Sequence, residues 1–62
     1  MPLTKRDVAA LPAETLFYVR ADLGDAIDAG EQMARAGLSV PKLGQYHDEL
    51  YVVAEELKRR GF

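Results

Sequence analysis

The sequence predicts an all-α protein built on an antiparallel helical hairpin, with long helices at about residues 13–36 and 41–60 and a short N-terminal helix at about 5–10. Two stretches repeat apolar or small residues at alternating steps of three and four, and a short breaker separates them. This spacing places one narrow apolar stripe on each helix, and two such stripes pack against each other. The first stripe is Leu16, Val19, Leu23, Ala26, Gly30, Met33 and Gly37, and the second is Leu43, Tyr46, Leu50, Val53 and Leu57.

The N-terminal helix is indicated by Thr4 followed three residues later by Asp7, the pattern of an N-cap and an acidic first turn. The helix should end at Leu11, because a residue that precedes proline is disfavoured in the helical conformation. Pro12 in turn fits the first turn of the next helix, where its missing N–H costs little. We therefore expect a break between two helices at this proline.

The first long helix is predicted from its stripe, although residues 15–20 also suit a β-strand. This segment is rich in β-branched and aromatic residues, which favour strands. A strand needs a second strand beside it, and the rest of the chain offers none. Such a strand would have to pair with its copy in another subunit, so the helix is our main prediction and the strand is the alternative.

Small residues gather on the first long helix, where they would let another segment approach closely. They are either a surface for a partner or space for side chains of the second helix. We expect the second, with room made for Tyr46 and Tyr51. The small residues are Ala26, Ala29, Gly30 and Gly37.

The turn between the long helices is predicted at residues 37–41. Gly37 is a natural C-cap for the first helix. Ser39 suits the N-cap of the second helix, and Pro41 suits its first turn. We therefore expect the second long helix to begin at about Pro41.

The second long helix has favourable local charges. Glu55 with Arg59 and Glu56 with Arg60 are oriented as i,i+4 ion pairs. Basic residues also gather at the C-terminal end, where the helix dipole is negative. Gly61 is then a plausible stop signal.

Size and composition predict one small domain, residues 1–62, that depends on a partner. A core of this size is only marginally stable. The chain has no cysteine and one histidine, which excludes disulfides and Cys/His zinc sites. We therefore expect support from a second subunit and no cofactor. Without a membrane-length apolar run or a signal-peptide pattern, we expect a cytoplasmic protein with no membrane partner.

The charges are unevenly distributed, although the formal net charge is only −2. Residues 21–34 contain four acidic residues and no basic residue, whereas residues 58–60 are all basic. A general nucleic-acid-binding protein is normally basic overall. The uneven pattern favours antiparallel self-association or a basic partner, or else a solvated acidic helix face.

Several large apolar residues fall outside the two stripes and predict an interaction surface. A two-helix hairpin cannot cover them all, so the N-terminal helix covers them, a homodimer buries them as a four-helix bundle, or a partner does. Together with nearby acidic residues, the candidate partner-binding residues are Phe17, Tyr18, Asp22, Asp25, Ile27, Asp28, Tyr51 and Val52.

No motif predicts catalysis. His47 lies beside the second stripe and is followed by Asp48 and Glu49, but helix neighbours one and two apart diverge and cannot share one site. A general base also needs a pocket and an orienting partner. We expect a surface histidine, no catalytic residue, no metal site and no enzymatic activity.

The breaker also resembles the centre of a helix-turn-helix motif, through Met33, Gly37, Ser39 and Leu43. This resemblance covers about fifteen residues and implies a second helix that reads DNA. The DNA-contacting residues would be Lys42, Gln45 and Tyr46. The chain departs from the motif at Met33, where alanine is usual.

The sequence thus favours a small non-enzymatic interaction or regulatory module that self-associates and binds a protein partner. Such short chains are typical of accessory proteins of bacteria and phages. The alternative is a compact helix-turn-helix regulator with its turn at residues 37–41. The angle between the long helices separates the two predictions, because a hairpin is nearly antiparallel and a DNA reader crosses steeply.

Overall fold

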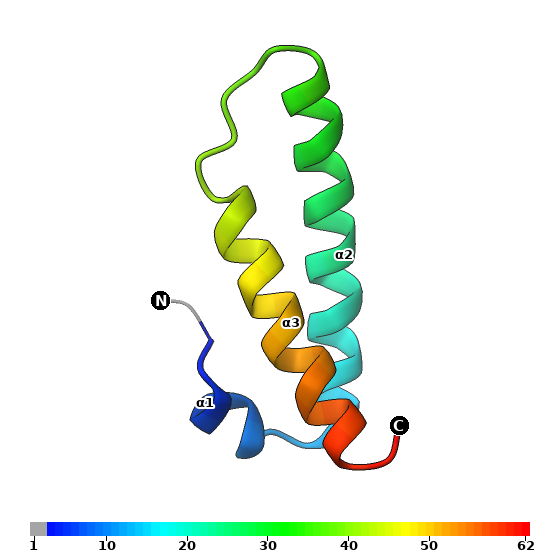
Figure 1. Ribbon diagram of the computed structural model, residues 1–62. Coiled ribbons are helices and arrows are strands. Elements are labelled where there is room, and N and C mark those ends of the chain that lie inside the picture. The colour runs from blue at the N-terminus through cyan, green and yellow to red at the C-terminus, as the bar shows by residue number, and fades with distance from the viewer. Residues whose placement is uncertain (1–2) are drawn as a thin grey trace.

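The computed structural model describes residues 3–62, which form the helices α1 (Lys5–Ala9), α2 (Ala13–Arg35) and α3 (Leu43–Arg59). The two long helices run antiparallel and side by side, and α1 packs against the C-terminal half of α3 (Figure 1). This arrangement confirms the predicted all-α hairpin with a short N-terminal helix. Residues 15–20 lie inside α2, so the strand alternative is wrong.

Helix α1 begins with a capping box. The Thr4 hydroxyl accepts a bond of 3.2 Å from the Asp7 backbone N–H, and the Asp7 carboxylate accepts one of 3.0 Å from the Thr4 backbone N–H. The two side chains thus satisfy two backbone donors that a helix start leaves free. Pro12 is the N-cap of α2, with extended backbone, and not a first-turn residue as predicted.

Both long helices end at a glycine with positive φ. Gly37 has φ 87°, and the N–H of Leu38 donates to the carbonyl of Met33 at 3.0 Å. Gly61, with φ 95°, ends α3 in the same way. This left-handed conformation strains any residue with a Cβ, so both predicted glycine stops are confirmed.

Helix α3 starts two residues later than predicted. Pro41 and Lys42 form a turn that the 3.1 Å bond from the Leu43 N–H to the Val40 carbonyl closes. Lys42 takes the N-cap position without a side-chain bond. The prediction that Ser39 caps this helix is therefore wrong.

The core lies between the three helices, at the end of the hairpin where α1 packs. Its buried members are Val8, Leu16, Leu23, Val53 and Leu57. Farther along α2, Ile27 is buried at 6 % exposure, whereas Met33 is 45 % exposed. The predicted stripe is therefore wrong at its far end, because an α-helix drifts about 20° per heptad against a strict seven-residue repeat.

Gly30 allows the turn to approach α2 closely. A Cβ at this position would lie 3.0 Å from Leu43 Cδ1 and 3.2 Å from Val40 Cγ1. The small residue therefore makes room for the turn and the start of α3. It does not make room for Tyr51, which is 63 % exposed, so that part of the prediction is wrong.

Candidate interaction surface

Glu56 is one of two buried carboxylates of α3, with Glu49, and two arginines pair with it. Arg59 Nε and Nη2 donate to its carboxylate at 3.0 and 2.6 Å, and Arg60 Nε donates at 2.6 Å. The predicted Glu56–Arg60 pair is confirmed, whereas Arg59 bonds Glu56 and not Glu55 as predicted. Hydrogen bonds from Arg59 and then Arg60 lower the pKa of Glu56 from 4.5 to about 2, because they stabilise its charged form.

Arg60 ties α3 to α1. Its Nη2 donates to the carbonyl oxygens of Val8, Ala9 and Leu11 at 3.2, 3.3 and 2.7 Å. These carbonyls belong to the C-terminal end of α1 and the residues that follow, where a helix leaves acceptors free and favours a cation. Arg60 thus adds a side-chain cap to the backbone bonds with which Ala10 ends α1, and Glu56 holds that cap in place.

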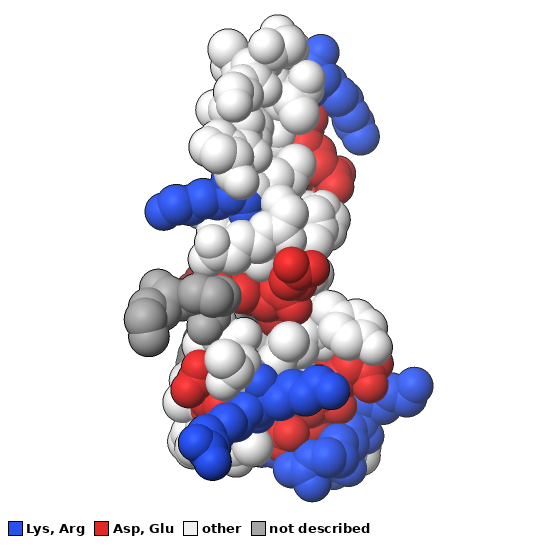
Figure 2. Space-filling view, turned by 60° about the vertical axis from the view of Figure 1, so that its left-hand side comes forward, with Lys and Arg blue, Asp and Glu red and all other residues white. Residues whose placement is uncertain are grey.

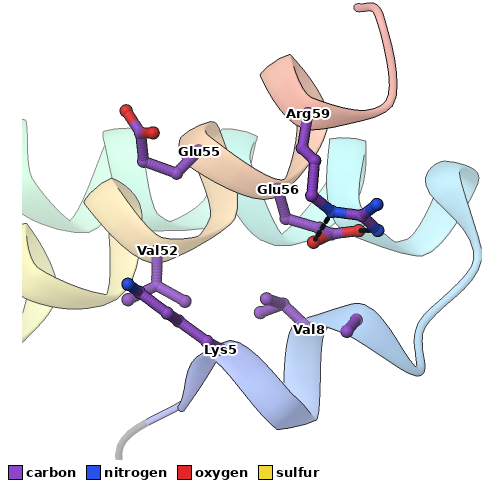
Figure 3. A pocket seen from close by; sticks show the side chains of 7 residues that line it. Lys5, Val8, Val52, Glu55, Glu56 and Arg59 are labelled. Carbon is purple, nitrogen blue, oxygen red and sulfur yellow. Dashed lines mark hydrogen bonds and ion pairs between the residues drawn. The ribbon is translucent and has the colours of Figure 1, made fainter.

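A groove of about 410 Å³ lies between α1 and α3 (Figure 3). Val8 and Val52 form apolar parts of its lining, Lys5 extends across Val52, and Glu55 points away from α1. The charged groups of Glu56 and Arg59 in this groove bond each other. Val52 was predicted as a partner-binding residue, but it is half-buried in this lining. The groove is therefore part of the packing interface between α1 and α3.

The exposed aromatic residues lie outside the core. Tyr18, Tyr51 and Phe62 are between 63 % and 67 % exposed, and Phe17 is 37 % exposed. Tyr46 is half-buried and packs beside the core. Four of the five aromatic residues are thus exposed to solvent, which is typical of interaction sites.

Two of these aromatic residues form a cluster with an arginine. The rings of Phe17 and Phe62 meet edge to face, with centroids 5.2 Å apart. The guanidinium of Arg20 lies over the Phe17 ring, 5.2 Å from its centroid. The cluster joins α2 to the end of the chain, on the opposite side of α3 from α1 (Figure 1).

The predicted partner-binding residues differ in exposure and do not lie on one surface. The acidic residues Asp22, Asp25 and Asp28 are all exposed, as are Phe17, Tyr18 and Tyr51. Ile27 is buried, so it cannot belong to an exposed surface, because the helical drift described above turns it towards α3. Tyr51 lies on α3. The residues that remain on α2 lie on two sides of it, since Tyr18, Asp22 and Asp25 share one face, and Phe17 and Asp28 share another.

His47 links the two long helices at the surface. Its Nε2 lies 3.4 Å from Glu31 Oε1, and both side chains are about half exposed. The contact is an ion pair when the imidazole is protonated. Within residues 3–62, no group of three or more His, Cys, Asp or Glu side chains is placed to hold a metal ion. No helix in the same part of the chain has the length and apolarity to cross a membrane.

The residues of the helix-turn-helix alternative do not form an open surface. Lys42 is exposed, but Gln45 donates to the Glu49 carboxylate at 3.1 Å and Tyr46 packs beside the core. The long helices are antiparallel and do not cross steeply as in a helix-turn-helix (Figure 1). This geometry gives the DNA-binding alternative no support.

The distribution of charge separates the two ends of the molecule. On the face drawn in Figure 2, basic and acidic side chains crowd together over the end formed by α1 and the end of α3, and the opposite end is mostly uncharged except along its edges. No family model, curated protein or solved structure matches this chain. A function for this chain is therefore argued from its own surface, and the exposed aromatic and acidic residues of the hairpin are the features that support one.

Proposed function

We propose that the protein is a non-enzymatic interaction module that binds a protein partner through the hairpin. The exposed aromatic residues carry this proposal. Among residues 3–62, six apolar side chains are buried and six large ones are exposed. Tyrosine, phenylalanine and arginine are enriched at the energetically important centres of protein interfaces. A self-sufficient small domain buries most of its aromatic side chains in its own core.

The outer face of α2 is the proposed site for that partner. Tyr18, Asp22 and Asp25 are spaced by four and three residues, so they form one exposed ridge. A tyrosine beside two carboxylates suits a partner with a basic rim around an apolar hollow. The partner class is therefore a basic protein surface, and we place the encounter in the cytoplasm, where a chain without cysteine needs no oxidising conditions.

Photocrosslinking in the native cell tests this proposal. A benzophenone side chain in place of Tyr18 should form a covalent adduct with another protein. Reversing both ridge charges, with Asp22→Lys and Asp25→Lys, should abolish the adduct. The matched control Asp48→Lys, on the exposed side of α3, should leave it intact. Absence of an adduct, or an adduct that survives the ridge reversal, would contradict the proposal.

A DNA titration separates this function from its alternative. Duplex DNA at low salt should give no binding, because the ridge is acidic and two of the three predicted DNA-contacting residues are engaged within the fold. Binding that weakens steeply as salt rises would instead indicate contacts to phosphates. In that case Lys42→Ala should reduce both the affinity and its salt dependence.

A further inference from the structure

One side of α2 carries a pattern that complements itself. Phe17, Arg20, Gly24, Asp28 and Glu31 follow one another at steps of three, four, four and three, so they lie along one side of the helix. We call these five residues the α2 flank. The flank contains the Phe17 ring that meets Phe62, so it lies on the side of the hairpin away from α1 (Figure 1).

The self-complementarity appears when two copies of α2 are placed antiparallel with Gly24 opposite Gly24. In this arrangement a residue before Gly24 faces the residue that lies equally far after Gly24 in the second copy. Arg20 therefore faces Asp28 of the second copy. The same pair forms a second time, because a two-fold axis repeats every contact. An interface of this kind matches opposite charges on both sides of its centre.

The charges of Arg20 and Asp28 are available for these contacts, with the Arg20 guanidinium lying over the Phe17 ring. Neither Arg20 nor Asp28 forms an ion pair with any residue in the described range 3–62. A Cβ placed on Gly24 would meet nothing within 4 Å, so the surface at the centre is open. A glycine there also lets a second helix approach to the short end of the usual 8–10 Å range of helix separations.

The exposed area of the chain is large enough for such an interface. The solvent-accessible surface is 4550 Å², whereas a compact monomer of 6.9 kDa exposes about 4000 Å². The molecule is correspondingly elongated, at 38 × 19 × 14 Å. A standard interface buries about 800 Å² on each partner, which is a small part of this exposed surface.

We propose that the α2 flank binds a second copy of this chain, with the two α2 helices antiparallel about a two-fold axis at Gly24 and with reciprocal Arg20–Asp28 pairs. This inference deepens the proposed function and rests on it, since it assigns one surface of the interaction module to self-association. The ridge of Tyr18, Asp22 and Asp25 lies on another side of α2, so it stays accessible in the dimer. The two surfaces can therefore be tested separately.

Sedimentation velocity of charge-reversed variants tests the pairing. The natural chain should approach twice the monomer mass in the micromolar range. Arg20→Asp alone and Asp28→Arg alone each place like charges opposite one another twice, and each should weaken self-association by about tenfold or more. An equimolar mixture of the two variants should form a heterodimer, because both carboxylates of the first variant then face arginines of the second. A single chain with both changes should dimerise again.

Matched controls keep the experiment decisive. Asp22→Arg makes the same charge change as Asp28→Arg on the same helix but off the flank, so its dimer should persist. Circular dichroism should show equal helicity in all variants, which removes unfolding as a cause. A natural chain that stays monomeric throughout the micromolar range, or single variants that dimerise as well as the natural chain, would overturn the inference. Neither outcome would affect the Tyr18 adduct that tests partner binding.

Discussion

The two sides of the hairpin are built from the same pair of helices but are completed in different ways. On one side α1 packs against α3, and Arg60 bonds three carbonyl oxygens at the end of α1. On the other side the described chain supplies no third helix, only the ring of Phe62 against Phe17. The first side encloses a core, and the second presents an aromatic ring, an arginine and a carboxylate to solvent.

This difference shows how a chain of 62 residues can combine stability with a binding surface. The side chains least exposed to solvent, Val8, Leu16, Val53 and Leu57, are all at 0–1 % exposure and gather where α1 covers the hairpin. The uncovered side contributes little to this core. Changes on the covered side should therefore act on folding, and changes on the uncovered side should act on association.

Truncating the core should have the largest effect. Leu57→Ala removes a side chain that is 1 % exposed, so it should lower the free energy of unfolding by about 2–5 kcal/mol. Leu50→Ala should cost less, because Leu50 is only half-buried. Leu38→Ala in the turn, where the side chain is 57 % exposed, should change stability by less than about 0.5 kcal/mol. Urea melts would measure all three, and equal costs for Leu57 and Leu38 would contradict the assigned core.

Removing the cap of α1 should have the next largest effect. Arg60→Ala leaves three carbonyl oxygens without their charged donor, which should cost about 1–3 kcal/mol. Arg59→Ala should cost less, because its side chain is 67 % exposed and it makes no such bond to α1. Hydrogen exchange should show faster exchange in α1 for the Arg60 variant alone. Unchanged exchange in α1 would mean that Arg60 does not hold this helix.

Acid should weaken the ion pairs that Glu56 forms with Arg59 and Arg60. The pKa of Glu56 falls from 4.5 to about 2 on folding, so the unfolded chain takes up the proton first as the pH drops. The stability that Glu56 contributes is complete above pH 4.5 and is lost as the pH falls towards about 2. Glu56→Gln should flatten this part of the stability profile, whereas the matched variant Glu55→Gln should keep it. A profile with the same slope in both variants would exclude Glu56 as its source.

Alanine substitutions at two glycines should give the smallest effects, with a gain in stability at one and no gain or a loss at the other. Gly24→Ala places a methyl group in open space, so it should raise the helix stability by about 0.5–1 kcal/mol. Gly30→Ala forces Leu43 and Val40 to move, which should cancel or reverse that gain. Thermal melts at concentrations below self-association would compare them. Equal gains at both positions would show that the turn adapts freely to the added methyl group.

The features predicted correctly from sequence are those that neighbouring residues determine. The N-cap at Thr4 with Asp7 in the first turn, the break at Pro12 and the glycine stops at Gly37 and Gly61 each depend on a few residues in a row. Local hydrogen bonds and allowed φ values decide such features without any help from the rest of the fold. The two long helices themselves were predicted from the spacing of their apolar residues, which is also a local pattern.

The features that sequence alone missed depend on distant parts of the chain. The bonds of Arg60 to α1 join residues about 50 positions apart, and nothing local to either end signals them. The late start of α3 reflects the turn whose Val40 packs against Gly30, and the burial of Ile27 depends on how far α2 turns relative to α3. In the candidate surface, sequence identified Phe17 and Asp28 but not Arg20, whose position over a ring only the fold shows.

Disulfide trapping would test the central claim most directly, that the uncovered side of α2 meets its own copy at Gly24. The chain has no cysteine, so a single introduced one reports on one position. Gly24→Cys should form a disulfide-linked dimer under mild oxidation, because residues on the two-fold axis come within the Cα distance of about 4.4–6.8 Å that a disulfide needs. Ala29→Cys, exposed on a different side of α2, should remain monomeric. Equal trapping at both positions, or faster trapping at residue 29, would contradict the account.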